Sequence, residues 1–135
     1  MDCEIDHLGI AVPSIEEALR FYHQTLGMTV TGRETVETEG VNVAMLPAGT
    51  ASRAGRLELL EPVSEESTIA RFLKKRGPGL HHVALRVDDL PATVERLKAV
   101  GAKLLNEPRP GAGGHIYVFV HPSSTGGVLL ELIQN

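Results

Sequence analysis

Two histidines and two glutamates stand at matched positions of the sequence, each within a stretch that is otherwise apolar. His7 lies 75 residues before His82, and Glu58 lies 73 residues before Glu131. Leucines flank both glutamates, so the alternation of a β-strand turns each carboxylate away from the apolar face. Two buried carboxylates repel each other unless a divalent cation balances their charge. Imidazole with carboxylate suits Zn, Mn, Co, Ni or Fe, so the four residues predict one shared metal site.

Taken singly, each of these residues has a simpler explanation. A lone strand histidine is more often a hydrogen-bonded structural residue, and a lone strand glutamate more often lies on a solvated face. The repeated pairing favours the metal site, because chance does not readily place His and Glu twice at related positions. The remaining candidates are weaker. His81 is expected either to support a metal ligand from behind or to be structural, and His115, after the Gly-rich loop, to approach a ligand. His23 is expected on the surface, His121 in a turn, and Cys3 to be inert.

An internal repeat places the four residues on equivalent elements. Residues 5–26 resemble residues 80–100, and residues 56–62 resemble residues 128–134. Apolar residues alternate at the start of each half, which predicts a strand with one face turned to a helix. The opposite face carries small residues around one histidine. Each half is therefore predicted to run strand, helix and then several strands.

Helix signals complete the two halves. Ser14 is predicted to cap a first helix that ends at Gly27, and residues 90–101 repeat its apolar pattern. A bridging helix is expected over about 65–77, and the Gly- and Pro-rich stretch 108–114 is expected to be a loop. The prediction is an α+β fold with a mixed sheet, built as one domain over residues 1–135 from two tandem βαβββ modules. Their bounds are about 4–62 and 79–134.

Composition excludes several functional classes. The chain has 135 residues, with 13 basic and 17 acidic side chains and a net charge of −4, which argues against nucleic acid as a partner. No apolar run approaches the roughly 18 residues that a membrane helix needs. The N-terminus is acidic and unlike a secretory signal. The single cysteine excludes an internal disulfide. The expectation is a cytoplasmic protein that binds neither nucleic acid nor a membrane.

Three stretches carry a resemblance to a known family: IDHLGIAV at 5–12, the segment LELLEPVSEESTIARFLKKRGPGLHHVALRVDD at 57–89, and HPSSTGGVLLELIQ at 121–134. Over essentially its whole length the chain resembles the methylmalonyl-CoA epimerase family of the vicinal oxygen chelate superfamily. The resemblance implies a curved, cup-like mixed sheet around one divalent metal. Co²⁺ is the expected ion, with Zn²⁺, Mn²⁺ and Ni²⁺ as alternatives. The metal-ligand positions of the family fall on His7, His82 and Glu131, and Glu58 stands where the family carries Gln or Glu.

The implied reaction interconverts the (2R) and (2S) forms of an acyl-CoA, methylmalonyl-CoA. Inversion through an enolate requires one acid/base group on each face of the substrate. Glu131 is the expected first group and Glu58 the second. Some family members place a glutamate in the third strand, but this chain has Val43 there, or Asn42 if a gap is placed differently.

A second departure concerns the CoA phosphates. Ser123 stands where relatives often carry lysine, so Arg109 or the cluster 74–76 is expected to provide the cation instead. Exposed edge strands favour a homodimer.

Alternative functions remain within the same superfamily. A glyoxalase I-like lyase or isomerase would use the same four ligands on a glutathione hemithioacetal, but the 57–89 segment favours the epimerase. A ring-cleaving dioxygenase would leave Glu58 unexplained. A non-catalytic drug-binding resistance protein would need aromatic side chains, which make up only 4% of this chain.

Overall fold

The computed structural model describes residues 3–135, which divide into two compact units. The N-terminal unit is His7–His81, and the C-terminal unit combines the residues up to Asp6 with His82–Asn135. Residues 1 and 2, part of the acidic N-terminus that argued against a secretory signal, lie outside the described residues. Across residues 3–135, every helix is too short or too polar to cross a membrane.

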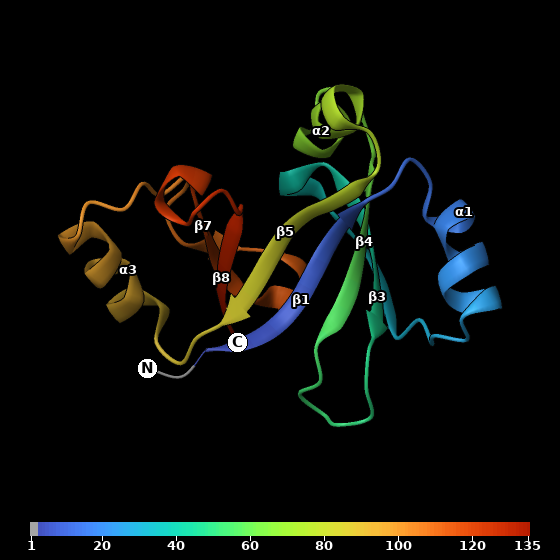
Figure 1. The fold of residues 1–135 in the computed structure, drawn as a ribbon, viewed down its shortest axis with the longest axis horizontal. Coiled ribbons are helices and arrows are strands. Elements are labelled where there is room, and N and C mark those ends of the chain that lie inside the picture. The colour runs from blue at the N-terminus through green and yellow to red at the C-terminus, as the bar shows by residue number, and fades with distance from the viewer. Residues whose placement is uncertain (1–2) are drawn as a thin grey trace. The chain divides into compact units, whose positions relative to one another are not determined.

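The N-terminal unit contains the first strand–helix–strands series (Figure 1). Its strands follow the order β2-β3-β4-β1, with β1 and β4 parallel and the other neighbours antiparallel. The elements are β1 (Glu4–Ala11, which begins in the C-terminal unit), α1 (Ile15–Leu19), the π-helix η1 (Arg20–Thr25), β2 (Gly32–Val36), the 3₁₀ turn η2 (Glu37–Glu39), β3 (Val41–Pro47), β4 (Arg56–Pro62) and α2 (Thr68–Arg76).

The C-terminal unit repeats this arrangement in the order β5-β8-β7-β6, with β5 and β8 parallel. The succession of elements confirms the predicted pair of β-α-β-β-β series joined by a helix. The elements are β5 (Gly79–Arg86, which begins in the N-terminal unit), α3 (Leu90–Ala99), β6 (Arg109–Pro110), the 3₁₀ turns η3 (Ala112–Gly114) and η4 (Pro122–Ser124), β7 (Ile116–Val120) and β8 (Leu130–Gln134).

Each unit has an apolar core between its first helix and one face of its strands. In the N-terminal unit, Ile15 and Leu19 of α1 pack with Leu59 of β4. In the C-terminal unit, Leu90 of α3 packs with Leu132 of β8. Because the leucines beside Glu58 and Glu131 enter these cores, pleating turns both carboxylates to the opposite face, as predicted.

The first amide of α1 and the first amide of α3 are each held by the last strand of the same unit. Glu61 of β4 accepts a hydrogen bond from Ile15 N at 2.9 Å, and Gln134 of β8 accepts one from Leu90 N at 2.6 Å. Ser14 also accepts from Glu17 N, which confirms the predicted cap. These contacts satisfy amides that have no partner inside a helix.

Two local predictions differ from the structure. The first helix widens into a π-helix over Arg20–Thr25, where the Thr25 hydroxyl donates to the carbonyl of Arg20. The stretch predicted as a loop contains the short strand β6, which pairs with β7. Pro110 is tolerated there because β6 is the last strand in the order, and an edge strand leaves some amides unpaired.

Candidate active site

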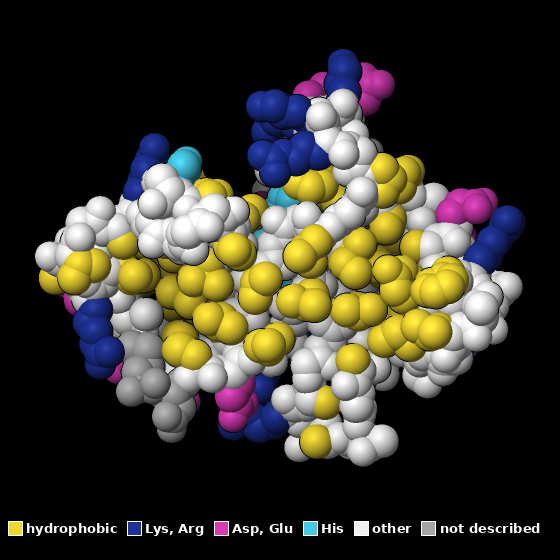
Figure 2. Space-filling model, viewed as in Figure 1, with side chains coloured by type: hydrophobic (Ala, Val, Ile, Leu, Met, Phe, Trp, Pro, Cys, Tyr) yellow, Lys and Arg dark blue, Asp and Glu magenta, His cyan; other side chains and the backbone are white. Residues whose placement is uncertain are grey.

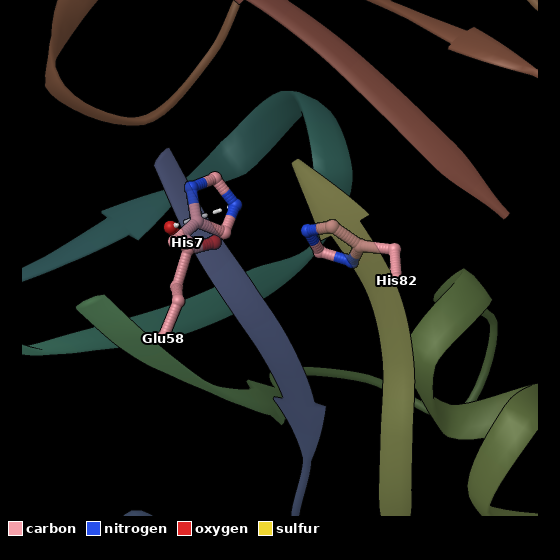
Figure 3. Close-up of side chains that lie close together, drawn as sticks. All are labelled: His7, Glu58 and His82. Atoms are coloured by element: carbon pink, nitrogen blue, oxygen red, sulfur yellow. Dashed lines mark ion pairs between the residues drawn. The ribbon is translucent and has the colours of Figure 1, made fainter. Parts of the chain in front are cut away.

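The N-terminal unit holds His7 against Glu58. Glu58 of β4 lies opposite Gly9 of β1, which is two residues beyond His7, so both side chains share one face. His7 Nε2 lies 3.4 Å from Glu58 Oε2 (Figure 3). Both residues are buried, at 2% and 5% exposure. The parallel pairing of β1 with β4 therefore brings the His7 imidazole next to the Glu58 carboxylate.

The C-terminal unit contains the equivalent pair. Glu131 of β8 lies opposite Ala84 of β5, two residues beyond His82. His82 Nε2 lies 3.0 Å from Glu131 Oε1, and both residues are buried. In each half, a histidine on the first strand thus meets a glutamate on the last strand, and the two strands are parallel neighbours.

These donor atoms suit a first-row divalent metal ion. His7, Glu58 and His82 are all buried, and each offers one ligand atom to a metal ion. Imidazole nitrogen and carboxylate oxygen are the common protein ligands of zinc and its neighbours in the first transition row. A buried carboxylate is costly without a positive partner, and a divalent ion supplies that charge. The side chains therefore fit the predicted type of cofactor.

An aromatic residue that the sequence did not single out packs against His82. Phe119 of β7 is the cross-strand neighbour of Glu131, and its ring meets the His82 ring edge-on at 5.4 Å. Tyr117 continues the row, with its ring 5.5 Å from Phe119 and its hydroxyl 2.8 Å from Arg109 Nε. The alternating pattern of Ile116–Val120 indicates a strand. It does not indicate which strand lies beside it, so the contact between Phe119 and His82 could not be predicted.

Strand β3 has no acid/base group at the position where the family resemblance suggested a glutamate. Val43 is buried in an apolar cluster with Leu60 and Ile69. Asn42 points to the other face, where its amide donates to Glu61 Oε2 at 2.9 Å. Neither side chain can remove a proton from carbon.

The remaining histidines lie outside the two pairs. His23 is exposed, and its Nδ1 lies 2.6 Å from the carbonyl oxygen of Met28. His121 accepts from Ser123 N and caps a turn, as predicted. The ring of His81 meets Phe72 of α2 edge-on at 4.9 Å.

A charged network lies next to the site in sequence. Arg86 of β5 donates to Asp6 Oδ1 at 2.6 Å and to Glu4 Oε2 at 2.8 Å. The hydrogen bond to Glu4 raises the pKa of Arg86, and the negative charge of Asp6 adds to this rise although burial opposes it. The guanidinium of an arginine is charged throughout the physiological pH range, so Arg86 supplies a permanent positive charge to both carboxylates.

We expect Arg86→Leu to lower the free energy of unfolding by about 3 kcal/mol, because it leaves the buried Asp6 carboxylate without its cation. Urea denaturation followed by circular dichroism measures this loss. The matched control is Arg20→Leu: its pair with Glu17 is exposed, so the expected change stays below about 0.5 kcal/mol. Equal losses in the two variants would contradict the assignment.

Comparison with known proteins places these pairs in a family context. The glyoxalase/bleomycin resistance protein/dioxygenase superfamily model matches residues 6–119. An ethylmalonyl-CoA/methylmalonyl-CoA epimerase of Cereibacter sphaeroides is 38% identical, over 96% of this chain and 96% of its own length. The structure of Streptomyces coelicolor methylmalonyl-CoA epimerase in complex with 2-nitronate-propionyl-CoA is also 38% identical, with a TM-score of 0.92 over 97% of this chain and 96% of its own.

Glyoxalase-type relatives are more distant. A probable lactoylglutathione lyase of Vibrio cholerae is 30% identical over 96% of this chain and 88% of its own length. The structural match confirms the predicted vicinal oxygen chelate fold. The chain belongs to the glyoxalase/bleomycin resistance protein/dioxygenase superfamily and, within it, to the methylmalonyl-CoA epimerase family.

Proposed function

We propose that this protein is an isomerase that interconverts (2R)- and (2S)-methylmalonyl-CoA. The observation that carries the proposal is the pair of buried His–Glu contacts in a chain that matches an epimerase along nearly its full length. A nitronate is a planar delocalised anion and so resembles an enolate, and tight binding of such analogues is typical of enzymes that stabilise the related transition state. The ligand of the Streptomyces coelicolor relative therefore supports enolate chemistry.

The proposed metal site combines His7, Glu58, His82 and Glu131 around one divalent ion. When bound, the ion supplies positive charge to a thioester oxygen that becomes negative as the enolate forms. The donor set of imidazole and carboxylate supports this assignment. Co²⁺ is the proposed ion, with Zn²⁺, Mn²⁺ and Ni²⁺ as alternatives that the same ligands accommodate.

Glu131 and Glu58 are the proposed acid/base groups. One carboxylate takes the proton from C2, and the electron pair of the broken C–H bond delocalises onto the thioester oxygen. The other group, in its protonated form, then delivers a proton to the opposite face of C2, which inverts the centre. The apolar surroundings of Val43 support Glu58 for the second role, because the third strand has no carboxylate at that position.

The proposed assembly is a homodimer in the cytoplasm. The strands β2 and β6 each have a hydrogen-bonded neighbour on one side only, so the other side of each offers backbone groups for pairing. Light scattering after gel filtration measures the mass: twice the chain mass supports the dimer, and the monomer mass contradicts it.

Proton exchange in deuterated water tests the reaction directly. We expect the purified protein to incorporate deuterium at C2 of methylmalonyl-CoA and to interconvert the epimers, because enolate formation exposes C2 to a solvent-derived proton. Mass spectrometry and chiral analysis of the product measure both events. The control substrate is the hemithioacetal of methylglyoxal and glutathione, which should not turn over. The reverse result would support a glyoxalase-type enzyme and reject the epimerase.

A further inference from the structure

A cluster of exposed cations covers helix α2. Arg71, Lys74, Lys75 and Arg76, called here the basic helix end, are four of the chain's 13 basic residues and occupy one nine-residue helix. Figure 2 shows dark-blue side chains gathered over this helix. Within residues 3–135, none of the four forms an ion pair with a carboxylate. The chain as a whole is acidic, so this local positive charge is a distinct feature.

Helix α2 lies over the same face of the N-terminal unit as His7 and Glu58. Ile69 of α2 packs with Ala11 of β1 and Leu60 of β4. Ala11 follows His7 by four residues and Leu60 follows Glu58 by two, so all four strand residues share one face. The apolar contact therefore separates the imidazole–carboxylate pair from the basic helix end.

The separation between the imidazole–carboxylate pair and the basic helix end is comparable to the length of the pantetheine arm of an acyl-CoA. From Ile69 to Arg76 the helix advances roughly 10 Å, and from Glu58 to Leu60 the strand advances about 7 Å. The pantetheine arm between thioester and diphosphate has two amide units and about as many bonds as four residues, so it extends on the order of 15 Å. The arm is of similar length to these two steps together, which supports a thioester near Glu58 with the nucleotide phosphates at the basic helix end.

Two side chains of the cluster are held in position. The Arg71 guanidinium donates to the carbonyl oxygen of Glu66. The guanidinium of Arg76 lies over the Phe72 ring at 5.9 Å from its centre, and Phe72 also meets His81. Cations in the last turn of a helix stabilise its dipole, which accounts in part for Lys74, Lys75 and Arg76. Arg71 lies outside the last turn, so the dipole does not explain the whole cluster.

We propose that Arg71, Lys74, Lys75 and Arg76 bind the phosphate groups of the nucleotide end of the acyl-CoA. This inference rests on the proposed function and names the part of the chain that anchors its substrate. Three phosphate groups carry the negative charge of coenzyme A, and a cluster of exposed cations attracts them through charge-assisted hydrogen bonds.

The test compares a substrate that has phosphates with one that lacks them. We expect Lys74→Gln/Lys75→Gln to raise KM for methylmalonyl-CoA about fivefold or more, with kcat within twofold, and to leave KM for methylmalonyl-pantetheine unchanged. Arg96→Gln/Lys98→Gln on α3 removes the same charge elsewhere and is expected to change neither KM. A loss that is equal for both substrates, or no change with methylmalonyl-CoA, would overturn the proposal.

Calorimetry of coenzyme A itself separates this inference from the proposed function, because it needs no turnover. Weaker coenzyme A binding by Lys74→Gln/Lys75→Gln than by the control variant supports the phosphate contact even if the wild-type protein epimerises nothing. Equal binding by the two variants overturns it even if the wild-type protein is active. Dephospho-coenzyme A, measured alongside, distinguishes a contact to the 3′-phosphate from one to the diphosphate.

Discussion

Glu131→Gln is expected to lower the rate of epimerisation by about 10²- to 10⁴-fold, the usual contribution of a positioned acid/base group. Glutamine keeps the size of the side chain and an oxygen near His82, but it cannot take a proton from carbon. Glu131 is buried and contacts His82 at 3.0 Å, so the substitution removes a well-positioned carboxylate. Initial rates with each epimer of methylmalonyl-CoA measure the effect.

Deuterium exchange distinguishes an acid/base role from a structural one. If Glu131 and Glu58 serve opposite faces, Glu131→Gln should still exchange C2 of one epimer without inverting it. Glu58→Gln should exchange only the other epimer. The exposed Glu107 provides the control, since Glu107→Gln should change neither rate. If both epimers lost exchange equally in each variant, the assignment of one group to each face would be wrong.

Removal of the metal is the second large effect. Dialysis against a chelator is expected to reduce epimerisation to background, and one equivalent of divalent ion per chain should restore it. The metal-free protein should also melt at a lower temperature, because buried carboxylates lose their compensating charge and a ligand of the folded state is withdrawn. Elemental analysis, activity and thermal melting together measure this prediction.

Single histidine variants locate the ion. His7→Ala and His82→Ala should each lower the metal content, whereas His23→Ala, which alters an exposed histidine of η1, should leave it at one ion per chain. Unchanged metal content in both site variants would refute the ligand set, whatever happens to activity.

The sequence was sufficient for the parts of the fold that follow local periodicity. Alternating leucines around Glu58 and Glu131 determine which way each carboxylate points, and the repeat indicates that His7 and His82 occupy equivalent strands. Pairing of β1 with β4 and of β5 with β8 then brings each His to its Glu.

Tertiary contacts explain what the sequence could not indicate. Phe119 meets His82 only because β7 pairs with β8, and no spacing along the chain reveals that register. Likewise, Arg86 reaches Asp6 across 80 residues, so the cation and its carboxylate cannot be matched by local pattern. Within the π-helix the Thr25 hydroxyl donates to the carbonyl of Arg20, a polar contact that apolar periodicity does not reveal.

The hydrogen bonds from Ile15 N to Glu61 and from Leu90 N to Gln134 disfavour a shift of strand register by two residues. Burial of apolar side chains alone does not disfavour such a shift. A strand that slips by one residue exposes its leucines, whereas a slip by two, about 7 Å, keeps every apolar side chain on the correct side. Such a slip would carry Glu61 away from its amide and put Leu60 in place of Glu58. In each half this hydrogen bond therefore fixes the register of the last strand, which sets Glu58 beside His7 and Glu131 beside His82.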